Sequence, residues 1–170
     1  MSERPMSKPE REAVTPVFKA TIPYDRVVIK DGLGLGQRPY TVPSAHPNRY
    51  FNIFLGSAFR KPLDDPPNWL IAYLVHELVH VWQSFNNGSA LAYAIDSMVN
   101  QGCMGKRAYV YEVGLNWSQY NVEQQAHIVE DWYLDGKQVS DPKYRYIRDN
   151  LWHPEKREGF SKQDLSGILQ

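Results

Sequence analysis

The chain has 170 residues, of which 42% are hydrophobic and 22% charged, and its formal net charge is zero. This is ordinary globular composition, and the length is sufficient for one domain with a sizeable core. The balanced charge gives no support for nucleic-acid or membrane-surface binding, and no apolar run reaches the length of a membrane span.

The cysteine content and the N-terminus indicate synthesis in the cytoplasm. Cys103 is the single cysteine, so an intrachain disulfide is excluded. The first residues contain no apolar core of a secretory signal peptide. We therefore expect any export to use a route that does not read a signal peptide.

The N-terminal part of the chain predicts a disordered segment followed by short strands. Residues 1–15 are polar and contain proline, which is typical of disorder. Residues 17–30 predict one or two strands with a break at 23–25, and residues 50–55 predict another. The glycine-rich segment 31–36 lacks both the G-x-G-x-x-G spacing and the lysine of a P-loop, so we interpret it as a loop.

Residues 68–85 predict a long buried helix. The segment contains no internal glycine or proline, and Asn68 is a suitable N-cap after two prolines. Asn86, Asn87 and Gly88 tolerate the left-handed conformation that ends helices. The helix is apolar almost all round, which is typical of a helix at the centre of a domain.

This helix carries the sequence His76-Glu77-Leu-Val-His80, an H-E-x-x-H motif. Histidines four residues apart lie on one helix face and can bind one zinc ion, while Glu77 can take a proton from a water on that ion. Random placement of the chain's histidines and glutamates gives roughly 0.008 such matches, so coincidence is a weak explanation. The alternative is a buried helix whose histidines only hydrogen-bond to neighbours.

The C-terminal half predicts further helices around this one. Residues 90–100 predict a short helix, and residues 109–113 predict a strand or an irregular segment. Residues 121–134 predict a second amphipathic helix, and a third opens at Asp141-Pro142 and runs roughly to Trp152.

These elements predict a single α+β domain with a small N-terminal β-sheet, the buried motif helix and a second helix carrying a third zinc ligand. The expected boundaries are a disordered segment at 1–15, the domain at 16–153 and a polar C-terminal tail at 154–170.

A third ligand is needed because catalytic zinc sites use three protein ligands and a water. The metzincin continuation is absent, since Gln83 and Asn86 occupy its glycine and histidine positions. The second helix offers four candidates: Glu123, His127, Glu130 and Asp131. We predict Glu123 as the ligand, with His127 as the alternative or as a supporting residue. Asp131 is the best remaining carboxylate for orienting His76 or His80.

The predicted chemistry is hydrolysis of a peptide bond with one Zn²⁺ per chain. Glu77 would act as the base towards the attacking water. A further donor should stabilise the oxyanion, and the sequence leaves three candidates open: Tyr111, Tyr120 and His153.

The segments H-E-L-V-H-V-W-Q at 76–83 and N-V-E-Q-Q-A-H-I-V-E-D-W at 121–132 together resemble a known group. It comprises the zincin-like metallopeptidase domains found with VgrG spike and Rhs proteins of bacterial type VI secretion systems. Segments 22–27 and 48–51 are similar to the N-terminal half of that group. The resemblance covers roughly residues 20–135.

The resemblance implies a zincin-like fold, with His76, His80 and Glu123 as zinc ligands and Glu77 as the catalytic base. It implies a toxin or accessory peptidase delivered by type VI secretion to the envelope of a target cell. The implied partners are a protein or peptide substrate, a secretion spike protein and an immunity protein.

Two other functions remain open at this point. One is a zinc-binding domain without hydrolytic activity that serves as an adaptor. The other is a zinc amidase that acts on peptidoglycan, for which the many aromatic residues would suit a glycan-binding groove.

Overall fold

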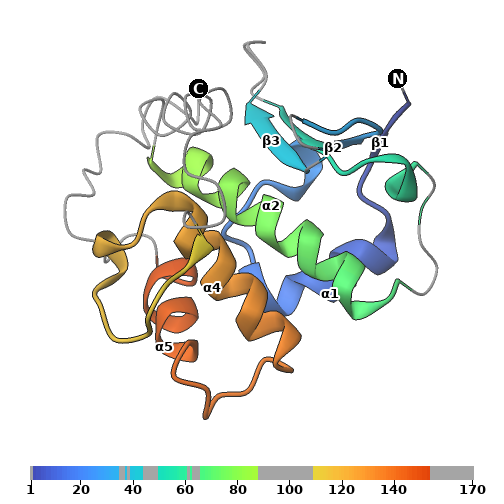
Figure 1. Ribbon diagram of the computed structural model, residues 1–170. Helices are drawn as coiled ribbons and strands as arrows, with labels where there is room; N and C mark the ends of the chain where they lie inside the picture. The colour runs from blue at the N-terminus through green and yellow to red at the C-terminus, as the bar shows by residue number, and fades with distance from the viewer. Residues whose placement is uncertain are drawn as a thin grey trace.

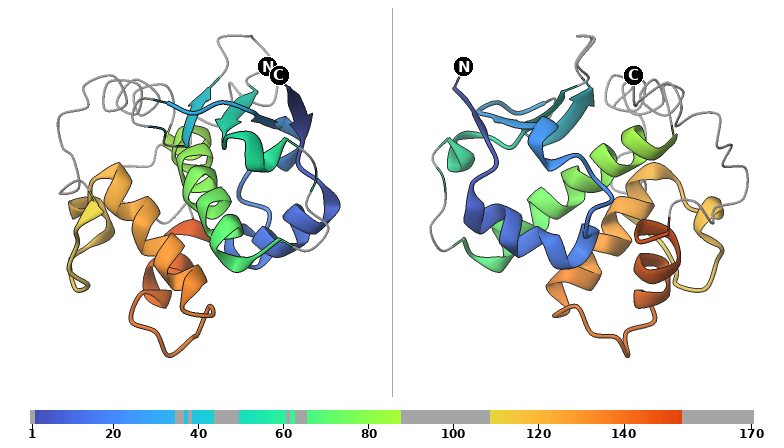
Figure 2. Two further views of the ribbon diagram at one scale, coloured as in Figure 1. Left: turned by 45° about the vertical axis from the view of Figure 1, so that its right-hand side comes forward. Right: turned by 180° about the vertical axis from the view of Figure 1, so that it is seen from behind.

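The computed structural model describes residues 2–34, 37, 39–43, 50–60, 62, 66–87 and 109–153. Their structure agrees with the predicted α+β class: helix α2 (Asn68–Asn87) runs through the centre, between a small sheet and the remaining helices (Figure 1). The views in Figure 2 show the sheet on one side of α2 and helix α4 (Val122–Leu134) along another side.

The sheet is mixed, with strand order β1-β2-β4-β3, and only the β2–β4 pair is parallel. Its strands are β1 (Glu3–Pro5), β2 (Val27–Lys30), β3 (Tyr40–Pro43) and β4 (Phe51–Phe54). The central strands β2 and β4 alternate buried and half-buried residues, so that Ile29 pairs with Ile53 on the core face. Of the one or two strands predicted over residues 17–30, only β2 is confirmed, because Phe18 ends helix α1 and residues 19–26 form turns. The strand predicted at 50–55 is confirmed as β4, whereas β3 was not anticipated.

The N-terminal segment is ordered, which differs from the disorder that its polar composition predicts. Residues 3–5 form β1, and helix α1 (Lys8–Phe18) follows with a capping box between Ser7 and Glu10. Glu10 is fully buried and accepts two hydrogen bonds from the Arg4 guanidinium, at 2.6 and 2.8 Å. The charged residues are therefore paired with each other, while Val14, Val17 and Phe18 enter the core.

The Arg4–Glu10 pair should contribute strongly to stability. We expect Glu10→Gln to lower the free energy of unfolding by about 3 kcal/mol, because Arg4 would keep a nearly buried charge without its partner. Urea denaturation would measure the change. Glu12→Gln is the matched control, since Glu12 pairs with Lys8 only at 3.8 Å on the exposed surface and should change stability by about 0.5 kcal/mol or less. Equal effects of the two substitutions would contradict this assignment.

Helices α2 and α4 confirm the buried helix predicted over 68–85 and the amphipathic helix predicted over 121–134. The α4 N-terminus is closed by a capping box between Asn121 and Gln124. The two helices pack antiparallel, since Glu123 lies beside His80 and the later Glu130 lies beside the earlier His76. This crossing places polar residues of both helices in a largely apolar core.

The last described segment is less regular than the single helix predicted from 141 to 152. Pro142 lies in a turn, where the Asp141 side chain accepts from the Lys143 backbone N–H. Helix α5 (Tyr144–Tyr146) follows and continues as a π-helical turn over Ile147–Leu151. Residues 109–113 contain no strand. The helix predicted at 90–100 and the tail from 154 lie outside the described residues.

Among the described residues, no helix has the length and apolar character needed to cross a membrane. The long helix α2 instead buries most of its apolar side chains against the sheet, α1 and α4.

Candidate metal centre

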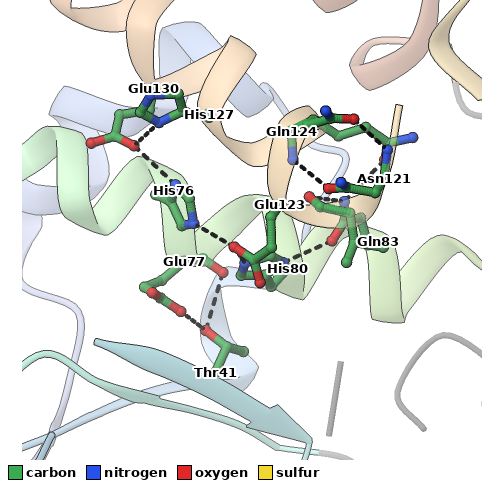
Figure 3. Close-up of polar contacts among 12 residues, drawn as sticks. Thr41, His76, Glu77, His80, Gln83, Asn121, Glu123, Gln124, His127 and Glu130 are labelled. Atoms are coloured by element: carbon green, nitrogen blue, oxygen red, sulfur yellow. Dashed lines mark hydrogen bonds and ion pairs between the residues drawn. The ribbon is translucent and has the colours of Figure 1, made fainter. Parts of the chain in front are cut away.

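His76, His80 and Glu123 come together between α2 and α4 (Figure 3). Glu123 Oε2 lies 3.3 Å from Nε2 of His76 and 3.5 Å from Nε2 of His80. One ligand atom from each of the three residues lies within 4.8 Å of the others. The structure therefore brings the three predicted ligands into one group that could hold a metal ion.

The second ring nitrogen of each histidine already has a partner. Nδ1 of His76 lies 2.9 Å from Glu130 Oε2, and Nδ1 of His80 lies 2.8 Å from Gln83 Oε1. The Gln83 amide nitrogen donates to Val122 O and to Gln125 Oε1, so its oxygen must accept. His80 therefore carries a proton on Nδ1.

This arrangement leaves both Nε2 atoms directed at a carboxylate. In neutral histidines that are protonated on Nδ1, both Nε2 lone pairs would face the negative Glu123 oxygen, which is repulsive without a cation between them. A proton on each ring or a metal ion can supply that positive charge. Two imidazole nitrogens and one carboxylate oxygen form the ligand set of a catalytic zinc site with an open position, so these residues fit zinc.

Glu77 is buried next to this group and is held by the sheet. The Thr41 hydroxyl of β3 donates to Glu77 Oε2 at 2.7 Å, as Figure 3 shows. Burial raises the pKa of Glu77, although the neighbouring histidines and the Thr41 hydrogen bond oppose that shift. A carboxyl group whose pKa is raised is better suited to accept and return a proton near neutral pH.

His127 belongs to a second group, with His76 and Glu130. Its Nδ1 lies 3.1 Å from the same Glu130 oxygen that contacts His76, and its ring contacts those of Tyr109 and Tyr111. The structure therefore does not bring His127 together with both His80 and Glu123. Its position matches the supporting role that the sequence left open.

Asp131 does not contact the motif histidines in the way that the sequence predicts. Glu130 takes the bond to His76, whereas Asp131 accepts from the Tyr111 hydroxyl at 2.5 Å and lies 3.9 Å from His127 Nε2. Neighbouring helix residues differ by 100° in direction, so only one of these two carboxylates can face His76. The prediction for Asp131 is therefore wrong.

The three predicted oxyanion donors have different surroundings. The Tyr111 hydroxyl donates to Asp131, beside His127. Tyr120 donates its hydroxyl proton to Glu112 O and accepts from the Leu115 N–H. These two hydrogen bonds stabilise the 112–115 loop. His153 follows Trp152, whose indole donates to Val17 O of α1, and belongs to neither histidine–carboxylate group.

Three further residues contact the centre: Thr41, Gln83 and Glu130. Among these, the sequence indicated only Glu130 as a candidate for the third ligand, and it predicted a supporting role for none of the three. Gln83 lies three residues after His80, a spacing that could have indicated a contact on the same helix face. Glu130 lies two helical turns after Glu123, which also places it on the same face. Thr41 gave no local signal, since its contact depends on how β3 lies over α2.

The charges of the centre are strongly coupled. Burial lowers the pKa of His76, but its hydrogen bonds to Glu123 and Glu130 outweigh that effect and raise the pKa to about 10. Burial raises the pKa of Glu130, but His127 and His76 outweigh it and hold the pKa at about 2. Burial also raises the pKa of Glu123, but His80 and His76 outweigh it and lower the pKa below its ordinary value. In the metal-free centre His76 therefore holds a proton at neutral pH, and the pKa of His80 is also raised by Glu123 against its burial.

Zinc binding should consequently strengthen as pH rises. The raised pKa of His76 lies above its ordinary value of 6.5, so a proton must leave the ring when a metal ion binds at any pH below about 10. We expect the zinc affinity to increase by at least about tenfold per pH unit between pH 6 and 9. Competition with a chromophoric chelator, corrected for the chelator's own protonation, would measure it. An affinity independent of pH would contradict the assigned charges.

The contact between Glu130 and His76 gives a sharper test of the supporting residues. We expect Glu130→Gln to weaken zinc binding by about ten- to hundredfold, because it removes the carboxylate that accepts from His76 Nδ1. Asp131→Asn is the matched neighbour and should leave the affinity nearly unchanged. The same chelator competition would compare them, and a larger loss in Asp131→Asn would reverse the assignment.

Comparison with known proteins finds similarity to the effector domain of a bacterial secretion protein. The type VI secretion system spike protein VgrG2b of Pseudomonas aeruginosa is 27% identical over 148 residues, which cover 81% of this chain. The solved effector domain of VgrG2b matches 84% of this chain and 81% of its own length, with a TM-score of 0.59 and 25% identity. This chain is related to a type VI secretion effector domain.

The similarity is confined to part of the spike protein, since this chain spans 14% of the length of VgrG2b. No family model matches the chain. The relationship thus concerns the effector domain and supports an effector-related role, while the activity has to be argued from the site.

Proposed function

We propose that this domain is a zinc-dependent peptidase with a zincin-like fold that serves as a type VI secretion effector. One observation carries the proposal: Nε2 of both motif histidines faces the Glu123 carboxylate, while Nδ1 of each is fixed by another residue. Such preorganised nitrogen ligands with supporting hydrogen bonds are typical of metal sites.

When bound there, zinc would lower the pKa of a coordinated water and polarise the carbonyl of a substrate. Glu77 follows His76 directly and has a raised pKa, so it can accept the proton of the attacking water and return it to the leaving amine. The Thr41 hydroxyl holds one Glu77 oxygen and leaves the other available for that proton. Tyr111 and His127 line the Glu130 side of the centre and are the candidates there for an oxyanion donor.

The buried Glu77 favours an enzyme over a zinc-binding adaptor. A metal-binding module needs the two histidines and Glu123 but gains nothing from a carboxylate at position 77. Burial of a carboxyl group has a cost in stability, here reflected in the raised pKa of Glu77. A role in catalysis accounts for that cost.

The relationship to VgrG2b supports delivery by type VI secretion. We infer that the domain is carried by a secretion spike protein, either as a bound effector or as part of a larger chain, and acts on proteins in the envelope of a target cell. A producing cell would then require an immunity protein against it.

The proposed activity can be tested with purified protein. Elemental mass spectrometry should find about one zinc per chain, and casein-like proteins should be cleaved in a reaction that a chelator stops and added zinc restores. Purified peptidoglycan would be tested in parallel. If the protein released peptides from peptidoglycan but left casein intact, it would be a zinc amidase. Zinc binding without cleavage of either substrate would support the adaptor.

A further inference from the structure

Helix α2 carries two exposed aromatic residues on its first turns. Trp69 and Tyr73 are 58% and 46% exposed, although most of the helix after them is buried. Their rings contact edge to face, with centroids 6.1 Å apart. An indole and a phenol ring held together in solvent lose the stabilisation that burial would give, and contiguous exposed apolar surface commonly marks a binding site.

The aromatic pair lies on the same face of α2 as the metal-site histidines. Positions 69, 73, 76 and 80 fall within about 60° of the helix circumference at 100° per residue. Tyr73 precedes His76 by three residues and Trp69 precedes it by seven, so they lie about 4.5 and 10.5 Å from it along the axis. The pair is therefore continuous with the candidate metal centre.

We propose that Trp69 and Tyr73 form a substrate subsite that binds a large apolar side chain of an extended peptide. This inference rests on the proposed peptidase function and adds a substrate preference to it. An extended chain advances about 3.3–3.6 Å per residue, so the bound side chain belongs one to three residues from the peptide bond at the metal. Binding there buries both rings, the substrate side chain and the surface between them.

The chemistry of the surrounding segment favours an apolar ligand. Residues 66–75 contain no charged side chain, and Pro66 and Pro67 directly precede the helix. A sugar ring would require several hydrogen-bonding groups beside the aromatic surface. The first three turns offer few of these, chiefly the Asn68 amide and the Tyr73 hydroxyl.

A cleavage profile would test this subsite. Wild-type protein and the double variant Trp69→Ala/Tyr73→Ala would each be incubated with a mixture of synthetic peptides, with the cleavage positions read by mass spectrometry. We expect the wild type to prefer a large apolar residue at one position one to three residues from the cleaved bond. The double variant should lose that preference while keeping its zinc.

Steady-state kinetics would separate the subsite from a general loss of activity. For a peptide with leucine at the preferred position we expect kcat/KM to fall about tenfold in the double variant, mainly through KM. The matching peptide with serine should be cleaved equally by both proteins. Tyr50→Ala is the control, since Tyr50 is an exposed aromatic residue outside α2 and should leave the preference intact.

Any other result would overturn the proposed subsite, and the results differ in whether the peptidase function is overturned with it. An unchanged preference in the double variant would remove the subsite and leave the peptidase standing, as would a wild type that cleaves without any preference. A zinc-loaded wild type that cleaves no peptide would overturn the peptidase and the subsite together. Light scattering that shows a dimer for the wild type and a monomer for the double variant would assign the aromatic pair to contact between two copies.

Discussion

Glu77→Gln should abolish proteolysis while zinc remains bound. General acid–base catalysis contributes about 10²- to 10⁴-fold to a rate, and glutamine cannot accept the proton of the attacking water. The three zinc ligands are untouched, and the glutamine oxygen can still accept from the Thr41 hydroxyl. Cleavage rates and the zinc content of the same preparation would measure both effects.

The stability of Glu77→Gln provides an internal check. The pKa of Glu77 is raised above its ordinary 4.5, so above that pH the buried charge destabilises the folded protein. Substitution by a neutral isostere should therefore leave the melting temperature at pH 7 equal or higher. An inactive variant with a lower melting temperature would indicate misfolding, and a fully active one would exclude Glu77 as the base.

The parts of this site that lie on one helix could be predicted from the sequence. His76, Glu77 and His80 are fixed relative to one another by helical geometry, and a segment without glycine or proline made that helix predictable. Glu123 required one further step, because a second amphipathic helix had to pack against the first. The predicted caps gave the starts of both helices within a residue: Asn121 is the N-cap of α4, whereas Asn68 is the first residue of α2.

Contacts between distant segments could not be predicted in this way. The choice between Glu130 and Asp131 depends on the rotation of α4 against α2, which hydrophobic periodicity fixes only to within about one residue. Thr41 reaches Glu77 because β3 is the edge strand beside β4, and that strand order has no local signature. The carboxylate that contacts His76, Glu130, therefore lies one position before the predicted one, Asp131.

The N-terminus shows the same limitation for the fold. Its polar composition is typical of disorder, yet Arg4 and Glu10 satisfy each other in a nearly buried ion pair. β1 is ordered because it pairs with β2 more than twenty residues later in the chain. Composition gives the number of charged residues but not whether each forms an ion pair in the folded protein.

Glu123→Ala should remove zinc from the centre, and it is the substitution that tests the third ligand most directly. Two histidines alone bind zinc weakly, so we expect dialysed Glu123→Ala protein to contain less than about a tenth of the wild-type zinc. His127→Ala should retain zinc, since His127 contacts Glu130 and does not belong to the group formed by His76, His80 and Glu123.

The protonation of the two histidines should change together with the metal in Glu123→Ala. Glu123 supplies hydrogen bonds that raise the pKa of His76 and His80, so without it both rings should titrate at lower pH in the metal-free protein. NMR titration of the ring protons in metal-free wild type and Glu123→Ala would follow this shift, with His127→Ala as the matched comparison. Zinc lost from His127→Ala but kept by Glu123→Ala would transfer the third ligand to His127 and make the centre a three-histidine site. Zinc lost from both variants would mean that the Glu130 contact of His127 is needed to hold His76 in place.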